Sequence, residues 1–292
     1  MANLPAIRLH EDVTMFQEAV NFTAAQTRFA ARLIEKDYFC TVLLAYLAGA
    51  TDGQVVFKGG TCLAKVLLGF YRLSEDLDFA IPMPFNSTRT ERRSRAALLK
   101  DAAETGARQL SGFQITEPLR GANNSTQYIG EVGYHSPITG QLEPIKIELS
   151  LREPLLTPIL EGSARTMLLN PIGGAPLVPD LALRCISQVE AMAEKVRAAM
   201  TRREVAIRDF YDLDYAVRTV GIQLQAPELV DLVRQKIQVP GNEAVQMGPE
   251  RLAELRGQLS GRLRPVLRQQ DYDDFDLDRA FEMVSAMLPL VG

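Results

Sequence analysis

Residues 55–82 read VVFKGGTCLAKVLLGFYRLSEDLDFAIP, and this stretch predicts a strand, a tight turn, a helix and a second strand. The apolar run at 55–57 is typical of a buried strand. Gly59 and Gly60 follow it, at a turn that larger side chains would obstruct. Thr61 stands where a helix N-cap is expected, and apolar residues recur after it at helical spacing, at Leu63, Val66, Leu67 and Phe70.

The second strand carries the residues that point to chemistry. Successive side chains of a strand point to opposite faces, so Asp76 and Asp78 share one face. Leu77, Phe79 and Ile81 share the other face, which we expect to lie in a core. Two carboxylates beside a glycine turn that opens a helix suit a Mg²⁺–triphosphate site, because N–H groups bind phosphate and carboxylates bind hard cations. Asp-x-Asp alone is typical of a solvated strand edge; its conjunction with the glycine turn favours the metal site.

This order of strand, Gly-Gly-Thr, helix and Asp-x-Asp strand is the one that DNA polymerase β-like nucleotidyltransferases use. More narrowly, FKGGTCLAK at 57–65 followed by RLSEDLDF at 72–79 resembles the AbiEii/AbiGii family. These are nucleotidyltransferase toxins of type IV toxin–antitoxin systems, and the MenT toxins resemble them. The resemblance implies Mg²⁺-dependent transfer from a nucleoside triphosphate to an RNA acceptor such as a tRNA 3′ end, a role in phage defence and a separately encoded antitoxin.

Composition predicts a soluble globular protein. The chain has 292 residues, of which 47% are hydrophobic and 23% charged, and its net charge is −4. Nucleic-acid contacts must therefore come from local basic patches. The odd number of cysteines, three, argues against a disulfide framework, and their apolar surroundings predict buried thiols. We find no signal peptide and no apolar stretch of membrane-spanning length, so we expect a cytoplasmic protein without a membrane partner.

The residues after the second strand predict a basic helix. Asn86, Ser87 and Thr88 are typical of a cap, and 90–110 has helical periodicity. Its beginning is rich in cations, namely Arg89, Arg92, Arg93, Arg95 and Lys100. Two interpretations remain: an ordinary solvated helix face, or a surface that contacts a polyanion near the site.

A third carboxylate is expected from a strand further along. Residues 113–135 contain alternating segments, and a turn at 138–140 indicates a hairpin with PIKIELSL at 144–151. In that strand Lys146 and Glu148 share one face. We expect Glu148 to pair beside Asp78 and complete the metal site, with Lys146 near the substrate. The alternative is an exposed Lys/Glu face of an edge strand.

Proline and glycine are frequent at 153–180, which predicts a boundary between two parts. We expect an α/β (α+β) nucleotidyltransferase-like core at 1–160 and a helical C-terminal domain at 161–292 that contributes to the active-site cleft. Asp180 is expected to cap a long helix that ends near Met200. Residues 226–290 predict two or three more helices, and the acidic run at 271–278 lacks the glycine of a calcium loop.

A second resemblance lies in the helical part. The family has Glu-Lys at a helix end followed by Arg-Asp-x-x-Asp-Leu, which correspond here to residues 194–195 and 208–213. The resemblance implies that Lys195 binds nucleotide phosphate, that Asp209 is a further catalytic acid and that Arg208 contacts substrate. Asp212 lies one helical turn beyond Asp209 and is expected to hold Arg208 or Lys195. The alternative interpretation of the nearby arginines is that they stabilise the negative C-terminal end of a helix.

The sequence therefore predicts a Mg²⁺-dependent nucleotidyltransferase. Asp76, Asp78 and Glu148 are expected to bind the metal, while Gly59, Gly60 and Thr61 cradle phosphates. Two alternatives use the same fold. One is transfer of a nucleotidyl or phosphoryl group to a protein hydroxyl, for which Ser74 is a candidate. The other is a binding protein that has no catalytic activity.

Overall fold

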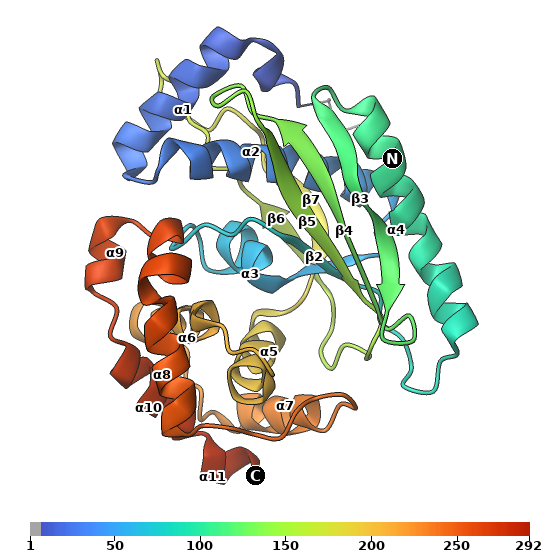
Figure 1. Ribbon diagram of the computed structural model, residues 1–292, viewed down its shortest axis with the longest axis vertical. Coiled ribbons are helices and arrows are strands. Elements are labelled where there is room, and N and C mark those ends of the chain that lie inside the picture. Colours follow the sequence, from blue (N-terminus) through green and yellow to red (C-terminus); the bar gives the residue numbers. More distant parts are fainter. Residues whose placement is uncertain (1–6) are drawn as a thin grey trace. The chain divides into compact units, whose positions relative to one another are not determined.

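The computed structural model describes residues 7–292, and the chain divides into two units. The first unit ends at Ile186, and the second runs from Ser187 to Gly292 (Figure 1). The first unit extends beyond the boundary expected at residue 160, because the chain returns to the first sheet at 181–185. There the backbone N–H of Ile186 donates a hydrogen bond to the carbonyl of Phe57, at 3.0 Å.

One mixed sheet organises the first unit. The seven strands of residues 7–292 lie in the order β3-β4-β5-β2-β1-β7-β6 (Figure 1). The central pairs are β2–β5, which is parallel, and β1–β2, which is antiparallel. The strands are β1 (Val56–Lys58), β2 (Leu77–Ala80), β3 (Phe113–Ala122), β4 (Gln127–His135), β5 (Leu142–Ser150), β6 (Leu160–Ala164) and β7 (Leu181–Cys185). The predicted α/β fold is confirmed.

Helices cover one face of this sheet. They are α1 (Val13–Thr27), α2 (Ala31–Ala50) and α4 (Arg89–Gln109), preceded by the 3₁₀ turn η1 (Leu9–Glu11). Phe39 of α2 stacks on Tyr134 of β4 with ring centroids 3.9 Å apart. The side chains that were predicted to face the core, Leu77, Phe79 and Ile81, are at most 2% exposed. Their burial supplies the main stabilisation of this layer.

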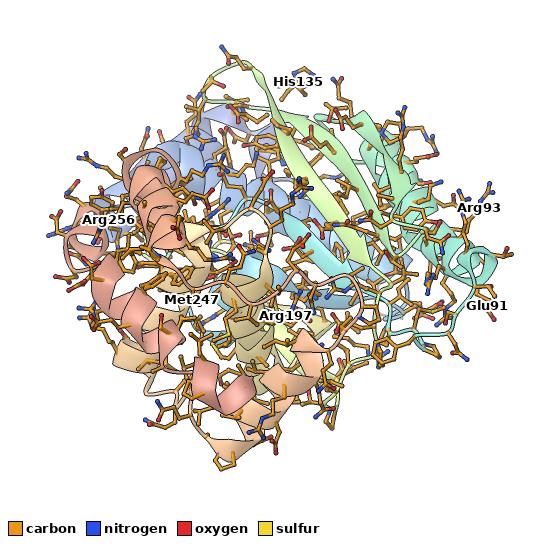
Figure 2. All side chains as sticks on the ribbon, turned by 60° about the horizontal axis from the view of Figure 1, so that its bottom comes forward. Glu91, Arg93, His135, Arg197, Met247 and Arg256 are labelled. Carbon is orange, nitrogen blue, oxygen red and sulfur yellow. The ribbon has the colours of Figure 1, made fainter. Side chains whose placement is uncertain are left out.

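The basic helix α4 begins with a capping box. The Thr88 hydroxyl accepts from the Glu91 backbone N–H, and the Glu91 carboxylate accepts from the Thr88 backbone N–H. The predicted cap is therefore confirmed. Glu91 and Arg93 project from the first turns of the helix (Figure 2), and Ala96 and Leu99 face the core at 0% exposure.

The helix after β1 starts earlier than predicted. α3 (Gly59–Cys62) has Lys58 as its N-cap residue and continues into a π-helical turn, η2 (Leu63–Leu67). Thr61 is therefore not the N-cap. Its hydroxyl donates to the backbone carbonyl of Asp76 at 2.5 Å, so Thr61 fixes the start of β2 instead.

The predicted long helix from Asp180 to Met200 is also wrong. Leu181, Leu183 and Cys185 alternate as buried side chains of β7, which pairs with β1 and β6. A new helix, α5 (Gln188–Thr201), begins after the N-cap Ser187. The alternation of buried and exposed residues in β7 extends over only five residues. Apolar residues on either side and Asp180, which is typical of a helix cap, made the segment resemble the start of a helix.

The regular structure of the second unit is helical, with more helices than predicted. After α5 come α6 (Ile207–Tyr215), α7 (Pro227–Ile237), α8 (Pro249–Gln258), α9 (Gln269–Asp273), α10 (Leu277–Ser285) and α11 (Leu288–Val291). Shorter π-helical and 3₁₀ turns are η3 (Ala216–Val220), η4 (Leu259–Leu263) and η5 (Arg264–Val266). None of the helices described in either unit is long and apolar enough to cross a membrane.

Candidate active site

Strand pairing places two of the predicted acids side by side. Asp78 of β2 is in register with Glu148 of β5, and Lys58 of β1 is in register with Asp78. Directly paired residues point to the same side of a sheet, so all three side chains lie on the face opposite α2. We call this the carboxylate face. Asp76 precedes β2 by one residue, and its carbonyl accepts from Thr61.

The glycine turn lies against these acids. A Cβ atom at Gly59 would lie 2.0 Å from a carboxylate oxygen of Asp78, and Gly59 has a φ of 74°. Only glycine therefore allows the turn to approach Asp78 this closely. A Cβ at Gly60 would lie 2.6 Å from the Arg72 guanidinium and 3.0 Å from the Ser74 hydroxyl. Gly59, Gly60 and Ser74 thus surround the start of α3 beside Asp78.

Asp78 lies close to two other acidic residues, Glu148 and Asp76. Burial raises the pKa of the Asp78 carboxyl, and the nearby Glu148 and Asp76 raise it further, to about 7. Carboxylates that repel one another in this way are the hard oxygen donors that Mg²⁺ binds, so the chemistry of the donors fits the cation. As the side chains stand, no group of three His, Cys, Asp or Glu residues within 7–292 could hold a metal ion.

Both carboxylate oxygens of Glu148 already have partners. The Gln127 amide donates to one at 2.7 Å, and the Lys146 ammonium group lies 3.2 Å from the other. Gln127 is a residue that sequence analysis missed. Its only signal was its place in an alternating segment, which does not identify the strand opposite. The two donors fix the orientation of Glu148 toward the carboxylate face.

The second unit contains the other predicted charged residues. The Lys195 ammonium group lies 2.7 Å from Asp209 and 2.7 Å from Asp212. Arg202 lies 3.2 Å from the second oxygen of Asp209. Burial opposes ionisation of Asp209, but Lys195 and Arg202 outweigh it and lower its pKa. Asp212 therefore holds Lys195, and Arg208 forms no ion pair with any residue of 7–292.

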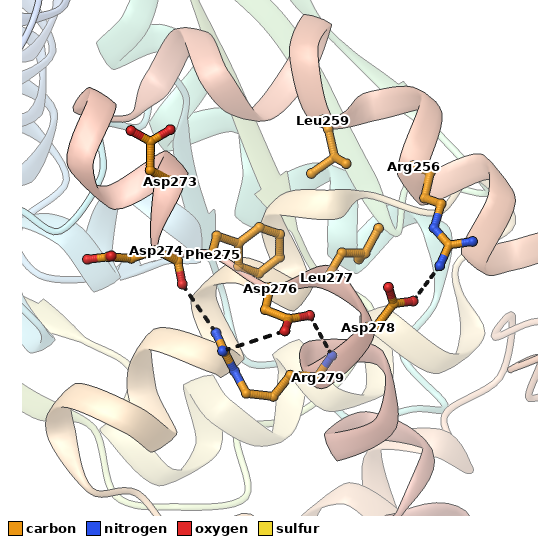
Figure 3. Close-up of a pocket in the computed structure, with 9 residues that line it drawn as sticks. All are labelled: Arg256, Leu259, Asp273, Asp274, Phe275, Asp276, Leu277, Asp278 and Arg279. Carbon is orange, nitrogen blue, oxygen red and sulfur yellow. Dashed lines mark hydrogen bonds and ion pairs between the residues drawn. The ribbon is translucent and has the colours of Figure 1, made fainter.

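An open pocket of the second unit is lined by the acidic run at 273–278 (Figure 3). Asp278 forms an ion pair with Arg256 at 2.5 Å, and Asp276 caps α10 by accepting from the Arg279 backbone at 3.0 Å. These acids thus act in helix capping and ion pairing, which agrees with the rejection of a calcium loop.

Comparisons with known proteins agree with the fold and identify the family. The model of the family "Nucleotidyl transferase AbiEii toxin, Type IV TA system" matches residues 42–284. JHP933 from Helicobacter pylori is 16% identical, with a TM-score of 0.51 over 90% of this chain and 93% of that chain. MenT4, a nucleotidyltransferase toxin from Mycobacterium tuberculosis, is 19% identical, with a TM-score of 0.51 over 88% of this chain and 93% of that chain. A search of curated proteins gave no significant match.

The chain is therefore a nucleotidyltransferase. It belongs to the AbiEii family of nucleotidyltransferase toxins from type IV toxin–antitoxin systems, because the family model covers most of its length. The family resemblance read from the glycine turn and the Asp-x-Asp strand is confirmed.

Proposed function

We propose that this protein transfers a nucleotidyl group from a nucleoside triphosphate to an RNA acceptor, with a tRNA 3′ end as the first candidate. The pairing of Asp78 with Glu148 beside the Gly59 turn carries this proposal. Gly59 and Gly60 bring the start of α3 close to Asp78, and the backbone N–H groups there are proposed to donate to the phosphates. A Mg²⁺ pair bound here would stabilise the entering and leaving oxygens of the transfer.

Asp76, Asp78 and Glu148 are the proposed ligands of the metal. Gln127 and Lys146 each engage one oxygen of Glu148, and a metal ion bound to Glu148 would compete with the Lys146 ammonium group for its oxygen. Lys146 then becomes available to a phosphate oxygen of the substrate. Neutralising the crowded carboxylates also removes the repulsion that raises the Asp78 pKa.

We assign supporting roles to the second unit in the same proposal. Lys195 is proposed to bind the triphosphate, with Asp209 and Arg208 assisting. Its two carboxylate partners hold the ammonium group in one position, which is the preorganisation that transfer to an anionic substrate requires. We further propose that the reaction takes place in the cytoplasm, serves phage defence and is opposed by a separately encoded antitoxin.

The acceptor is tested by supplying the purified protein with each of the four α-labelled nucleoside triphosphates, Mg²⁺ and total RNA. Label that enters RNA and is lost on ribonuclease treatment supports the proposal. Label that enters the protein itself, and is lost in Ser74→Ala, would instead establish transfer to a protein hydroxyl. A chelator should abolish labelling, since the carboxylates alone have no means of stabilising the leaving pyrophosphate.

A further inference from the structure

Four arginines of the first unit lie exposed and without carboxylate partners. Arg89, Arg93 and Arg95 belong to the first turns of α4, and Arg120 belongs to β3. None of them forms an ion pair with any residue of 7–292. Several exposed arginines elsewhere are paired, for example Arg32 with Glu75, Arg234 with Asp231 and Arg256 with Asp278, while others such as Arg28 and Arg165 stand apart from one another in the chain. We call the four residues the basic edge.

The sheet register connects the basic edge to the carboxylate face. Arg120 pairs with Ile129 of β4, Ile129 pairs with Glu148, and Glu148 pairs with Asp78. These residues form one row across four strands with their side chains on one face. The neighbouring Leu119 is 3% exposed and faces the core, which agrees with this direction. Two strand spacings, about 10 Å, separate the backbone positions of Arg120 and Glu148.

Helix α4 brings its cations to the same edge. α4 runs antiparallel to β3, and Arg108 and Ile115 line one shallow pocket between them. The five strand residues from Ile115 to Arg120 span about 16 Å, which matches about eleven helical residues. Arg120 therefore lies level with the turn that follows Arg93. Arg93 projects from α4 at its exposed side (Figure 2).

Cations outnumber acids in the first turns of α4, while the pair Glu117 and Glu131 lies beside Arg120 on the sheet. Glu91 is the acid within these first helical turns, and its carboxylate is engaged by the backbone and hydroxyl of Thr88 at 2.6 and 2.8 Å. Unpaired guanidinium groups in a chain of net charge −4 lose no ion pair when they bind an anion. Phosphates spaced along a polymer suit such a row of cations, because each contact releases counterions.

We infer that the basic edge binds the phosphate backbone of the RNA acceptor and guides its end across Ile129 to Glu148 and Asp78. This inference rests on the proposed function, since it assumes an RNA acceptor. It assigns Arg93 and Arg120 to acceptor binding and gives them no part in binding the triphosphate.

The test compares two double variants of equal charge change. Arg93→Gln/Arg120→Gln removes two cations from the basic edge. Arg28→Gln/Arg165→Gln removes two exposed arginines that also form no ion pair with residues 7–292. We expect the first variant to bind RNA about tenfold or more weakly in low salt, with the slope of log K against log salt reduced by about one for each lost contact. The second variant should match the wild type.

Transfer kinetics separate this inference from the proposed function. The Arg93/Arg120 variant should show a raised KM for RNA with kcat and triphosphate binding unchanged. If the wild type labels RNA and the variant keeps the wild-type KM and salt slope, the basic edge is not the acceptor site. If the wild type neither binds nor labels RNA, the proposed acceptor fails and this inference with it. Weakened binding of an acidic protein, with RNA binding unchanged, would also overturn it.

Discussion

At the scale of single residues, Asp78 is the position at which site chemistry opposes stability. Its pKa is raised to about 7 by burial and by Glu148 and Asp76, so the native state holds a proton that the unfolded state releases near pH 4. The free energy of unfolding therefore falls as the pH rises from about 4 through about 7. The loss is complete above that range.

Asp78→Asn removes this loss in the metal-free protein. We expect the variant to be more stable than the wild type at pH 8, by at most about 4 kcal/mol at about 1.4 kcal/mol for each pKa unit. The difference should shrink as the pH falls toward 4. Urea unfolding with a chelator present measures it. If the free energy of unfolding changes with pH in the same way in both proteins, the pKa of Asp78 is not the one that is raised.

Gln127 is predicted to position Glu148. Gln127→Leu removes the 2.7 Å hydrogen bond and leaves Lys146 to hold the carboxylate without it. Loss of such a supporting contact typically costs about 10–100-fold in activity or metal affinity. We expect a lower kcat, a higher Mg²⁺ requirement and an unchanged KM for RNA, measured by transfer over a series of Mg²⁺ concentrations. A fall in activity that excess Mg²⁺ leaves unchanged would indicate a merely structural residue.

At the scale of elements, the contact of α5 with α6 depends on Lys195. Its ammonium group balances Asp209 and Asp212, which are 2% and 0% exposed. Lys195→Met removes the cation that both buried carboxylates share, although Arg202 still pairs with Asp209, and should destabilise the second unit by about 3–5 kcal/mol. Denaturant unfolding followed by circular dichroism measures this loss.

A matched variant separates that loss of stability from loss of function. Lys195→Met combined with Asp209→Asn and Asp212→Asn removes the charges together and should recover most of the stability. It should still bind triphosphate weakly, because the lysine remains absent. Recovery of triphosphate binding along with stability would show that Lys195 acts only within the fold.

The sequence predicted those elements whose pattern is local. The alternation at 144–151 and the capping residues of α4 appear in the structure as expected. The N-cap of α3 and the strand β7 were not predicted. Thr61 is held by Asp76, fifteen residues away in sequence, and β7 depends on pairing with β1. Contacts between distant segments decide both, and no local pattern encodes them.

The same limit applies to the site. Asp76, Asp78 and the glycines were found because they lie within one short motif. Glu148 was found because its strand alternates strictly, and the register that places it beside Asp78 came only with the structure. Gln127 and Arg120 were not identified as site residues, because a polar residue on a strand has the same pattern whether it faces solvent or a reactive group.

At the scale of the whole molecule, a chain of net charge −4 has no general attraction for RNA. Acceptor binding must therefore depend on local cations, and it should weaken steeply as salt increases. Triphosphate binding at the carboxylates should depend on Mg²⁺ instead. These two dependences can be measured separately on the intact chain.

Transfer of label from an α-labelled triphosphate to RNA, compared between the wild type and Asp78→Asn, tests whether Asp78 holds the metal ion of the transfer reaction. The substitution keeps the size of the side chain and removes the charge that binds Mg²⁺. We predict that Asp78→Asn transfers no detectable label while its melting temperature without metal equals or exceeds that of the wild type. Transfer by a folded Asp78→Asn at the wild-type rate would contradict a carboxylate-held metal site at this position.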